Sequence, residues 1–137
     1  MSNYTIDDLE RARELIDVPI VANQVEMHPL LAQERMRDYL RDREITLVAY
    51  SPIAQGDVFD VPEIAAIADD HDTSPAVVSL AWLLSKEGVV PIPRSGDEAH
   101  VGENYEALDL ELTDDEIDRI DAIETQHRCE DPDWMEW

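Results

Sequence analysis

Three short apolar runs, separated by helical patterns, constrain the fold of this chain more than any other feature of its sequence. They are "IVANQVEMH" (residues 20–28), "EITLVAYSP" (44–52) and "VVPIPRS" (89–95). Strands that alternate with helices predict right-handed crossovers and therefore a parallel sheet. The second run is nearly all apolar, so we expect that strand to be buried on both faces.

Helix start signals lie between these runs. Thr5 and Thr113 each open a capping box, with an acidic residue three positions later that bonds back to the cap. Ser74 and Pro75 combine a hydroxyl N-cap with proline at the first helical position, and Gly88 is expected to end that helix. Further helices are expected from about 31 to 43, from 62 onward and from about 97 to 107. The residues expected to face the core are Ile6, Leu9, Leu15, Ile16, Leu31, Met36, Tyr39, Leu40, Ile64, Ile67, Ala68, Trp82, Ile117, Ile120 and Ile123.

The number of strands is too small for the kind of sheet they predict. A chain of 137 residues is enough for one ordinary domain. Three parallel strands leave two bare sheet edges, whereas parallel sheets are normally covered and flanked by other elements. We therefore expect strands outside this chain to flank the sheet.

The charge of the chain limits its partners. It has 33 acidic and 10 basic residues, a formal net charge of −23, and Lys86 is its single lysine. Such a surface repels phosphate backbones and anionic lipid heads, so neither nucleic acid nor a membrane is expected as a partner. Dispersed acid with almost no lysine favours adaptation to concentrated salt, of the haloarchaeal type, over an ordinary acidic protein.

Cysteine use and hydropathy predict a cytoplasmic location. Cys129 is the single cysteine, so no internal disulfide can form, and we interpret its thiol as idle. No apolar run reaches the roughly 20 residues that span a bilayer, and the first residues do not resemble a secretory signal. His71 and His127 are expected at the surface. The acidic segment from about 125 to 137 is interpreted as a solvated tail, with Trp134 and Trp137 docked on the domain or frayed.

The stretch "NQVEMHPLL" (23–31) points three polar side chains in one direction. Gln24, Glu26 and His28 are spaced two apart and so share one face of a strand. They either line a site or form a buried polar layer, and we favour the polar layer for Glu26 and His28. A metal site is disfavoured, because two ligands on one strand lack a third in the pattern.

Five segments together closely resemble the later half of the aldo-keto reductases. They are "SNYTIDDLERA", "NQVEMHPLL", "ITLVAYSPIAQG", "SPAVVSLAWLL" and "VVPIPRSGDEAHVGEN", in the order and at the spacing of that family. The family has an α/β fold, the (β/α)8 TIM barrel of parallel strands. The resemblance implies that residues 1–137 form a partial barrel: the end of strand 5, strands 6 to 8, and the C-terminal helices.

The resemblance also implies an activity. The family reduces aldehydes and ketones by hydride transfer from NADPH, or runs the reverse oxidation. Its catalytic tetrad of aspartate, tyrosine, lysine and histidine lies on the second, third and fourth strands, which this chain does not match. Lys86 follows a helix of the later half and is no substitute. We therefore assign no catalytic residue and predict that the isolated chain is inactive.

The residues that the resemblance assigns to cofactor binding form two groups. Ser2, Asn3 and Gln24 match the residues that hold the nicotinamide carboxamide. Tyr50 matches the aromatic that stacks on the nicotinamide ring, and Ser51, Pro52 and Ile53 continue along the pyrophosphate. The second group, matched to the 2′-phosphate and adenine side of the cofactor, comprises Arg94, Ser95, His100, Glu103 and Asn104.

The choice between NADP(H) and NAD(H) depends on the second group. "RSGDEAH" leads into a helix, and helix N-termini bind anions; barrels of this kind often hold a phosphate there. His100 stands where the family usually has arginine, and histidine is a weaker, pH-dependent cation. Asp97 and Glu98 add negative charge nearby. We expect NADP(H), with NAD(H) as the alternative.

Three hypotheses remain for the chain as a whole. It is the C-terminal part of an aldo-keto reductase, from a shortened gene or a misplaced start codon, whose missing half would be its complement. Alternatively, it is a non-catalytic nucleotide-binding half barrel that self-associates. The third possibility is an inert remnant, because a half barrel with bare strand edges is marginally stable or aggregates.

Overall fold

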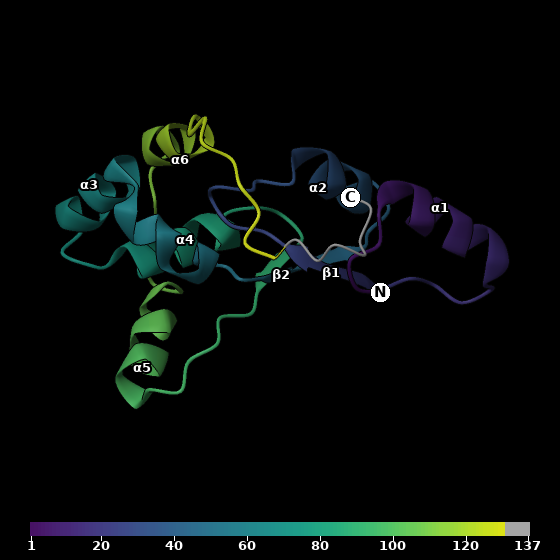
Figure 1. Cartoon of the computed structure of the whole chain (residues 1–137), viewed down its shortest axis with the longest axis horizontal. Coiled ribbons are helices and arrows are strands. Elements are labelled where there is room, and N and C mark those ends of the chain that lie inside the picture. Colours follow the sequence, from purple (N-terminus) through teal and green to yellow (C-terminus); the bar gives the residue numbers. More distant parts are fainter. Residues whose placement is uncertain (131–137) are drawn as a thin grey trace.

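A three-stranded parallel sheet organises the computed structural model, which describes residues 1–130 (Figure 1). The strands are β1 (Ala22–Glu26), β2 (Thr46–Tyr50) and β3 (Val89–Pro91), in the order β1-β2-β3. Both pairings are parallel, which confirms the predicted topology. Trp134 and Trp137 lie outside the described residues.

Helices follow each strand. They are α1 (Ile6–Leu15), α2 (Glu34–Arg41), the 3-10 segment η1 (Ala54–Asp60), α3 (Pro62–Asp70), α4 (Pro75–Leu84), α5 (Glu98–Glu106) and α6 (Asp114–Asp121). Both capping boxes and the Ser74 cap of α4 are present. Two boundaries differ from prediction: α2 begins after Gln33, whose φ is 51°, and α4 ends at Leu84. Gly88 instead occupies the tight turn before β3, with a φ of 74°.

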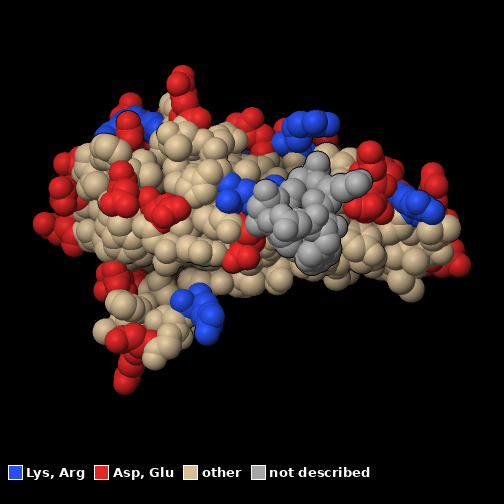
Figure 2. Space-filling view, viewed as in Figure 1, with Lys and Arg blue, Asp and Glu red and all other residues tan. Residues whose placement is uncertain are grey.

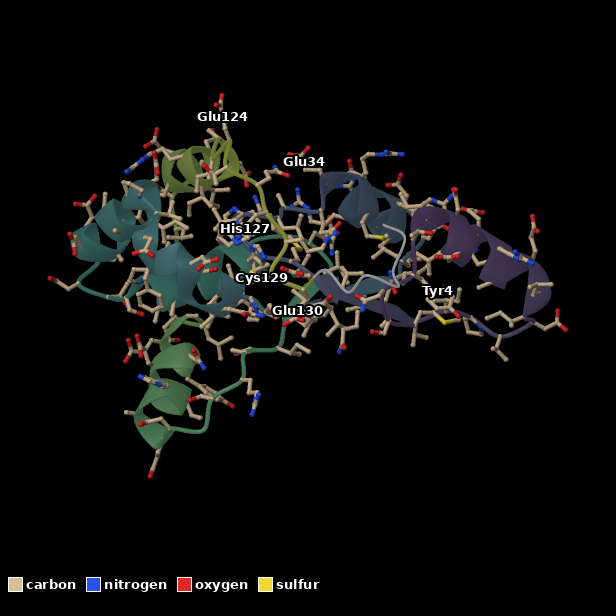
Figure 3. The ribbon with its side chains drawn as sticks, in the orientation of Figure 1. Tyr4, Glu34, Glu124, His127, Cys129 and Glu130 are labelled. Atoms are coloured by element: carbon tan, nitrogen blue, oxygen red, sulfur yellow. The ribbon has the colours of Figure 1, made fainter. Side chains whose placement is uncertain are left out.

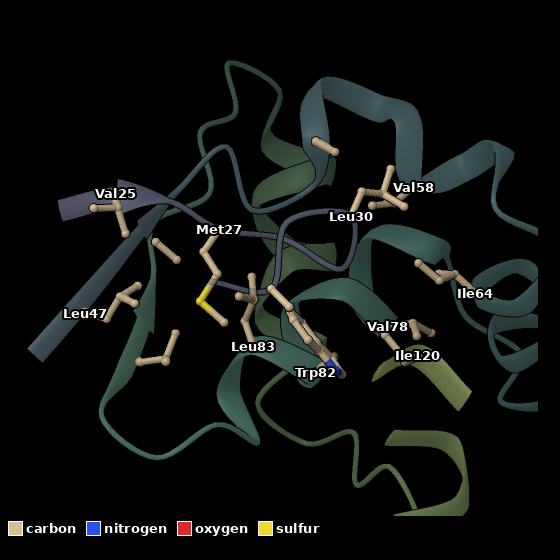
Figure 4. Packing of buried hydrophobic residues seen from close by; sticks show 14 of the residues in the cluster. Val25, Met27, Leu30, Leu47, Val58, Ile64, Val78, Trp82, Leu83 and Ile120 are labelled. Carbon is tan, nitrogen blue, oxygen red and sulfur yellow. The ribbon is translucent and has the colours of Figure 1, made fainter. Parts of the chain in front are cut away.

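One face of the sheet carries the core. Val25 of β1 and Leu47 and Ala49 of β2 point toward the helices and are buried. Trp82 and Leu83 of α4 are fully buried and belong to the same apolar cluster (Figure 4). The nearly complete burial of α4 confirms the prediction from its all-round apolar sequence.

The other face of the sheet is only partly covered. Burial alternates along β2, so Thr46, Val48 and Tyr50 are half-buried, and the prediction of a strand buried on both faces is wrong. Val90, beside Val48 on β3, is 48% exposed. The reason is that the residues described provide no second layer over this face.

The sheet edges differ from each other. The first residues extend the β1 edge through a parallel bridge between Ser2 and Gln24, as expected for the end of a preceding strand. On the far side of β3, residues 1–130 supply no paired strand. The flanking strands expected outside the chain stay a prediction at that edge.

Most predicted core positions of the helices are buried, but the end of α1 is not. Leu9, Leu40, Ile64, Ile67, Ala68, Trp82 and Ile120 are buried, whereas Ile6, Ile16, Leu31, Met36, Tyr39, Ile117 and Ile123 are half-buried. Leu15 is 74% exposed, contrary to prediction. Figure 1 shows why: α1 extends past the end of the sheet, so its last turn has no layer beneath it.

Acidic side chains are spread over the visible surface rather than gathered in one patch (Figure 2). This distribution matches the dispersed acid of the sequence. No helix among residues 1–130 is long and apolar enough to cross a membrane.

The capping box of α6 yields a testable prediction. The Thr113 hydroxyl accepts from the backbone N–H of Glu116, whose carboxylate accepts from the Thr113 N–H at 2.7 Å. We expect Thr113→Ala to lower the free energy of unfolding by about 1 kcal/mol, measured by urea denaturation followed by circular dichroism. Thr125→Ala, an exposed threonine outside the described helices, is the control.

The same cap predicts a direction of pH dependence. The backbone hydrogen bond from Thr113 is the main cause that holds the pKa of Glu116 below its ordinary value of 4.5. A carboxylate with a lowered folded-state pKa stabilises the fold above that ordinary value, and the stabilisation is lost as the pH falls through the lowered pKa. Thr113→Ala keeps this backbone N–H but removes the hydroxyl, which also donates to the Glu116 carboxylate at 2.9 Å. The difference in stability between wild type and Thr113→Ala should therefore be larger at neutral pH than in acid. An equal or larger difference in acid would contradict this role of Glu116.

Candidate functional site

The partly covered face of the sheet carries the first predicted group. In the parallel register Gln24 pairs with Val48 and Glu26 with Tyr50. Paired residues of parallel strands point to the same side, so Gln24 and Tyr50 lie on one face, with Tyr50 at the carboxyl end of β2. Residues that bind ligands in α/β barrels come from the carboxyl ends of the strands.

The first residues of the chain lie against this face. The Asn3 N–H donates to the Gln24 carbonyl at 2.8 Å, and the Gln24 N–H donates to the Met1 carbonyl at 3.0 Å. Burial is the main cause that raises the pKa of Tyr50, while a hydrogen bond with the Asn3 side chain acts in the opposite direction. Ser2, Asn3, Gln24 and Tyr50 are thus brought together from three segments.

Residues 51–53 connect β2 to η1 and are partly or fully buried, which limits their contact with a ligand. Ser51 has a φ of 47°, a left-handed conformation that turns the chain sharply after Tyr50. Pro52 is buried, and its carbonyl accepts from the Ser79 hydroxyl at 2.7 Å. Ile53 packs partly against the core. Ser51 and Ile53 are half-buried, so of these three residues Pro52 is the least accessible to a ligand.

The second predicted group surrounds a cleft between α4, β3 and α5. Arg94, Ser95 and Asn104 line this cleft together with apolar residues that include Val90 and Leu84. His100 and Glu103, on α5, are not among its lining residues. The structure therefore brings three of the five predicted residues together.

The N-terminus of α5 is already partly capped. The Asp97 carboxylate accepts from the Ala99 N–H at 2.8 Å, and the Ser95 hydroxyl accepts from the Asp97 N–H at 3.1 Å. Asp97 and Glu98 also place negative charge at this helix end. An anion bound there would rely on Arg94 more than on the helix dipole.

The polar layer predicted from "NQVEMHPLL" is confirmed. Glu26 and His28 are both 0% exposed, and His28 Nε2 lies 2.9 Å from Glu26 Oε1. One detail of the prediction is wrong: β1 ends at Glu26, so His28 lies beyond the strand. It is held there by paired backbone hydrogen bonds with Leu31.

The charge states of this pair follow from its surroundings. Burial raises the pKa of Glu26, but hydrogen bonds from His28 and from the N–H groups of Cys129 and Glu130 outweigh it and lower the pKa overall. Burial lowers the pKa of His28, against the attraction of Glu26. We therefore assign an ionised Glu26 and a neutral His28 that donates from Nε2.

The interpretation of the segment from residue 125 as a solvated tail is wrong for residues 127–130. The Cys129 and Glu130 N–H groups donate to Glu26 at 2.6 and 3.0 Å, and the His127 N–H donates to the Leu30 carbonyl at 3.0 Å. Figure 3 shows His127, Cys129 and Glu130 together where this segment passes the end of β1. Residues 131–137 lie outside the described part of the chain.

The contacts of His71 and Lys86 define the roles of two further side chains. His71 is half-buried and bonds Glu116 at 2.7 Å, so it is more than a surface residue. Lys86 pairs with Asp121 at 2.7 Å and lies 4.9 Å above the Trp82 ring. This engagement gives Lys86 a packing role between α4 and α6, and its exclusion as a catalytic lysine stays a prediction.

Comparison with known proteins identifies the family. The model of the aldo/keto reductase family matches residues 1–125, and the chain belongs to that family. It is 38% identical over 128 residues to glyoxal reductase of Bacillus subtilis (strain 168), covering 93% of this chain and 46% of that protein. It is 37% identical over 134 residues to the uncharacterized oxidoreductase YtbE of the same organism, covering 97% of this chain and 48% of that protein.

Solved structures support the same fold. Aldose reductase from Giardia lamblia superposes with a TM-score of 0.87 at 30% identity, over 93% of this chain and 45% of that one. An aldo-keto reductase complexed with NADPH gives a TM-score of 0.85 at 26% identity, over 96% of this chain and 43% of that one. The chain is thus a partial α/β barrel and spans about half the length of the curated relatives it matches.

Proposed function

We propose that this chain supplies the dinucleotide-contacting half of an NAD(P)H-dependent oxidoreductase that acts on carbonyl compounds. The observation that carries the proposal is the meeting of Ser2, Asn3, Gln24 and Tyr50 on the partly covered face of the sheet, with Tyr50 at the carboxyl end of β2. Family membership supports it, and so does the solved relative bound to NADPH. We place this activity in a reducing, cytoplasmic compartment and at high salt.

Each residue group has a distinct task in this proposal. The Gln24 amide and the Asn3 side chain orient the nicotinamide carboxamide, and the Tyr50 ring packs against one face of the nicotinamide. Because burial raises the pKa of Tyr50, its phenol stays neutral at physiological pH and does not repel the phosphates. Arg94, Ser95 and Asn104 hold the adenosine phosphate in the cleft beside α5. The roles of Ser51, Pro52, Ile53, His100 and Glu103 stay predictions.

We propose NADP(H) as the cofactor, with NAD(H) second. Arg94 is exposed and can meet a 2′-phosphate, and charge-assisted hydrogen bonds from arginine to phosphate are strong and often bidentate. His100 is exposed and outside the cleft, so it adds little fixed charge. Proton transfer and substrate binding are assigned to a complementary half of the barrel.

A fluorescence titration with NADPH tests the proposal. Wild-type chain, at a salt concentration where circular dichroism shows it folded, should bind NADPH. Arg94→Ala should weaken binding by about 1.5–3 kcal/mol, roughly 10- to 100-fold, and should weaken NADH binding less. Adding glyoxal, the aldehyde in the name of the Bacillus relative, should cause no NADPH oxidation above that of a heat-denatured sample.

Arg119→Ala is the matched control, because Arg119 is an exposed arginine of α6 that does not line the cleft beside α5. It should leave NADPH affinity unchanged. Absence of NADPH binding by the folded wild type, or equal losses in the two arginine variants, would refute the proposed cofactor site. Oxidation of NADPH by the isolated chain would refute the assignment of catalysis to another half.

A self-associating half barrel is a second candidate. It is favoured by the edge of β3 with which no strand of residues 1–130 pairs, and by exposed apolar residues in and around β3: Leu84, Val90, Ile92 and Leu108. Sedimentation of the titration samples distinguishes the two: a dimer with NADPH bound favours this candidate, and a monomer that binds NADPH favours a separate complementary half.

A further inference from the structure

Five side chains that can bind metal ions meet where the C-terminal segment crosses the carboxyl ends of β1 and β2. Glu26 is the last residue of β1, and His28 lies two residues beyond it. Asp57 belongs to η1, and His127 and Cys129 belong to the segment after α6. The sequence separation is large: Cys129 is 103 residues from Glu26, and His127 is 70 residues from Asp57. None of the cofactor residues proposed above belongs to this cluster.

The cluster consists of two sets of three ligands that share Cys129. Glu26, His28 and Cys129 form the inner set, and Asp57, His127 and Cys129 form the outer set, each with ligand atoms within 4.8 Å of one another. The thiol lies between the two imidazoles, with Sγ 3.8 Å from His28 Nε2 and 3.7 Å from His127 Nε2. Each histidine also contacts a carboxylate, at 2.9 Å for Glu26 and 2.8 Å for Asp57.

The outer set fits a tetrahedral metal ion. Zn–S distances near 2.3 Å and Zn–N distances near 2.0–2.1 Å place the sulfur and nitrogen of a tetrahedral site roughly 3.5 Å apart. The 3.7 Å between Cys129 Sγ and His127 Nε2 is close to that separation. The 2.8 Å between His127 and Asp57 must open by a few tenths of an ångström, and both side chains are free to move because they are 38% and 55% exposed.

The inner set is better suited to a supporting role. Glu26 Oε1 accepts from the Cys129 N–H at 2.6 Å and from His28 at 2.9 Å, so a metal ion there would have to displace bonds in a fully buried pair. His28 is 0% exposed, directs Nε2 toward the thiol, and its Nδ1 has no hydrogen-bond partner among the described residues. The inner pair therefore lies behind the outer set, and His28, whose Nε2 donates to Glu26, is not assigned as a ligand.

Charge and access favour a cation at the outer set. The carboxylates of Asp57, Glu26 and Glu130 surround the thiol, and the guanidinium of Arg128 lies 4.0 Å from Glu26 on the inner side. A divalent ion that displaces the thiol proton would neutralise the thiolate and Asp57 together. Asp57 and His127 also line a cleft between η1 and the segment after α6, which gives an ion a path from solvent.

We propose that Asp57, His127 and Cys129 form a Zn²⁺ site that ties the C-terminal segment to η1. Thiolate and imidazole ligands select Zn²⁺ over the hard cations Mg²⁺ and Ca²⁺. Three protein ligands leave a fourth position for water. Because the ion binds segments far apart in the sequence, it stabilises the folded state over the unfolded one.

Titration of the folded chain with Co²⁺ and Zn²⁺ tests this site. We expect one Co²⁺ per chain with a thiolate-to-cobalt charge-transfer band, displacement of Co²⁺ by Zn²⁺ and none by excess Mg²⁺. Cys129→Ser should abolish the band and weaken affinity by more than the roughly 10- to 100-fold cost of an outer-shell change. Zn²⁺ should raise the urea midpoint of the wild type and leave that of Cys129→Ser unchanged.

Variants at exposed positions keep the test independent of folding. Asp57→Asn and His127→Ala should each weaken Co²⁺ binding while circular dichroism stays that of the wild type. His71→Ala is the matched control, because His71 also bonds a carboxylate, at 2.7 Å from Glu116, and belongs to neither ligand set. Cobalt binding without a thiolate band, or an equal loss in His71→Ala and His127→Ala, would overturn the proposal.

Discussion

Trp82→Ala is expected to lower the free energy of unfolding by about 3–5 kcal/mol, the usual cost of removing a large buried aromatic side chain. Trp82 is 0% exposed and is the largest fully buried side chain of the described residues. It lies in the core cluster with Val78 and Leu83 of the same helix and Ile120 of α6 (Figure 4). Alanine would leave a cavity between α4 and α6 that short helices cannot close.

Trp82 also carries a polar contact that the substitution removes. Its indole Nε1–H donates to Asp121 Oδ1 at 2.8 Å, and Lys86 bonds the same carboxylate. The contact links α4 to the last turn of α6. Trp82→Phe keeps most of the apolar volume and loses this hydrogen bond, so we expect a loss of about 1 kcal/mol from the bond, plus a smaller cavity term.

Urea denaturation followed by circular dichroism measures both variants against the wild type at one salt concentration. Phe59→Ala is the control, because Phe59 is an aromatic residue that is 49% exposed. If the wild type is less stable than the expected loss, Trp82→Ala should be unfolded without urea while Phe59→Ala stays folded. Similar losses in Trp82→Ala and Phe59→Ala would show that α4 does not anchor the core.

The features predicted correctly from the sequence are those that depend on near neighbours along the chain. In both capping boxes and in the Ser74 cap, the cap hydrogen bonds join residues only three positions apart. The burial of Ile64, Ile67 and Ala68 follows from helical spacing alone. The partial burial of β2 could not be predicted in this way. Apolar residues on both faces of a strand do not reveal whether helices of the same chain cover both faces.

The candidate cofactor site was predicted from resemblance, and the register of the sheet explains why its residues converge. Gln24 and Tyr50 meet because β1 and β2 are parallel neighbours that end at the same edge. His100 and Glu103 were grouped with Arg94 by the resemblance, yet they are not among the residues that line the cleft. Figure 1 shows α5 set apart from the sheet at the end of an extended segment. Spacing along a helix does not specify how that helix is placed.

The polar cluster beside Glu26 was missed for a different reason. The sequence offers two ligands near β1 and a His-x-Cys pair 99 residues after His28, with no periodicity that connects them. An acidic, helix-poor segment resembles a solvated tail in composition. The hydrogen bonds from the Cys129 and Glu130 N–H groups to a buried carboxylate, and from the His127 N–H to Leu30, reveal that residues 127–130 are part of the fold.

Glu26→Ala should be the most damaging single change on the polar side of the sheet. It removes one carboxylate that accepts hydrogen bonds from His28 at 2.9 Å and from the N–H groups of Cys129 and Glu130 at 2.6 and 3.0 Å. Because His28 is neutral, removing Glu26 leaves three donors without their acceptor. Each unpaired donor typically costs about 1–3 kcal/mol, which for three donors sums to about 3 kcal/mol or more. We expect a loss of that size, with residues 127–130 released from the end of β1.

Hydrogen exchange at single amides separates this local release from general unfolding. In Glu26→Ala the amides of Cys129 and Glu130 should exchange as fast as in an unfolded chain, while those of β2, such as Ala49, stay protected. Glu26→Gln, which keeps an acceptor oxygen of the same reach, should lose less stability, and Glu124→Ala, at an exposed position of the same segment, should lose almost none. If Cys129 and Glu130 stay protected in Glu26→Ala, the segment is held by other contacts, such as the His127 N–H to Leu30, and the carboxylate is not its anchor.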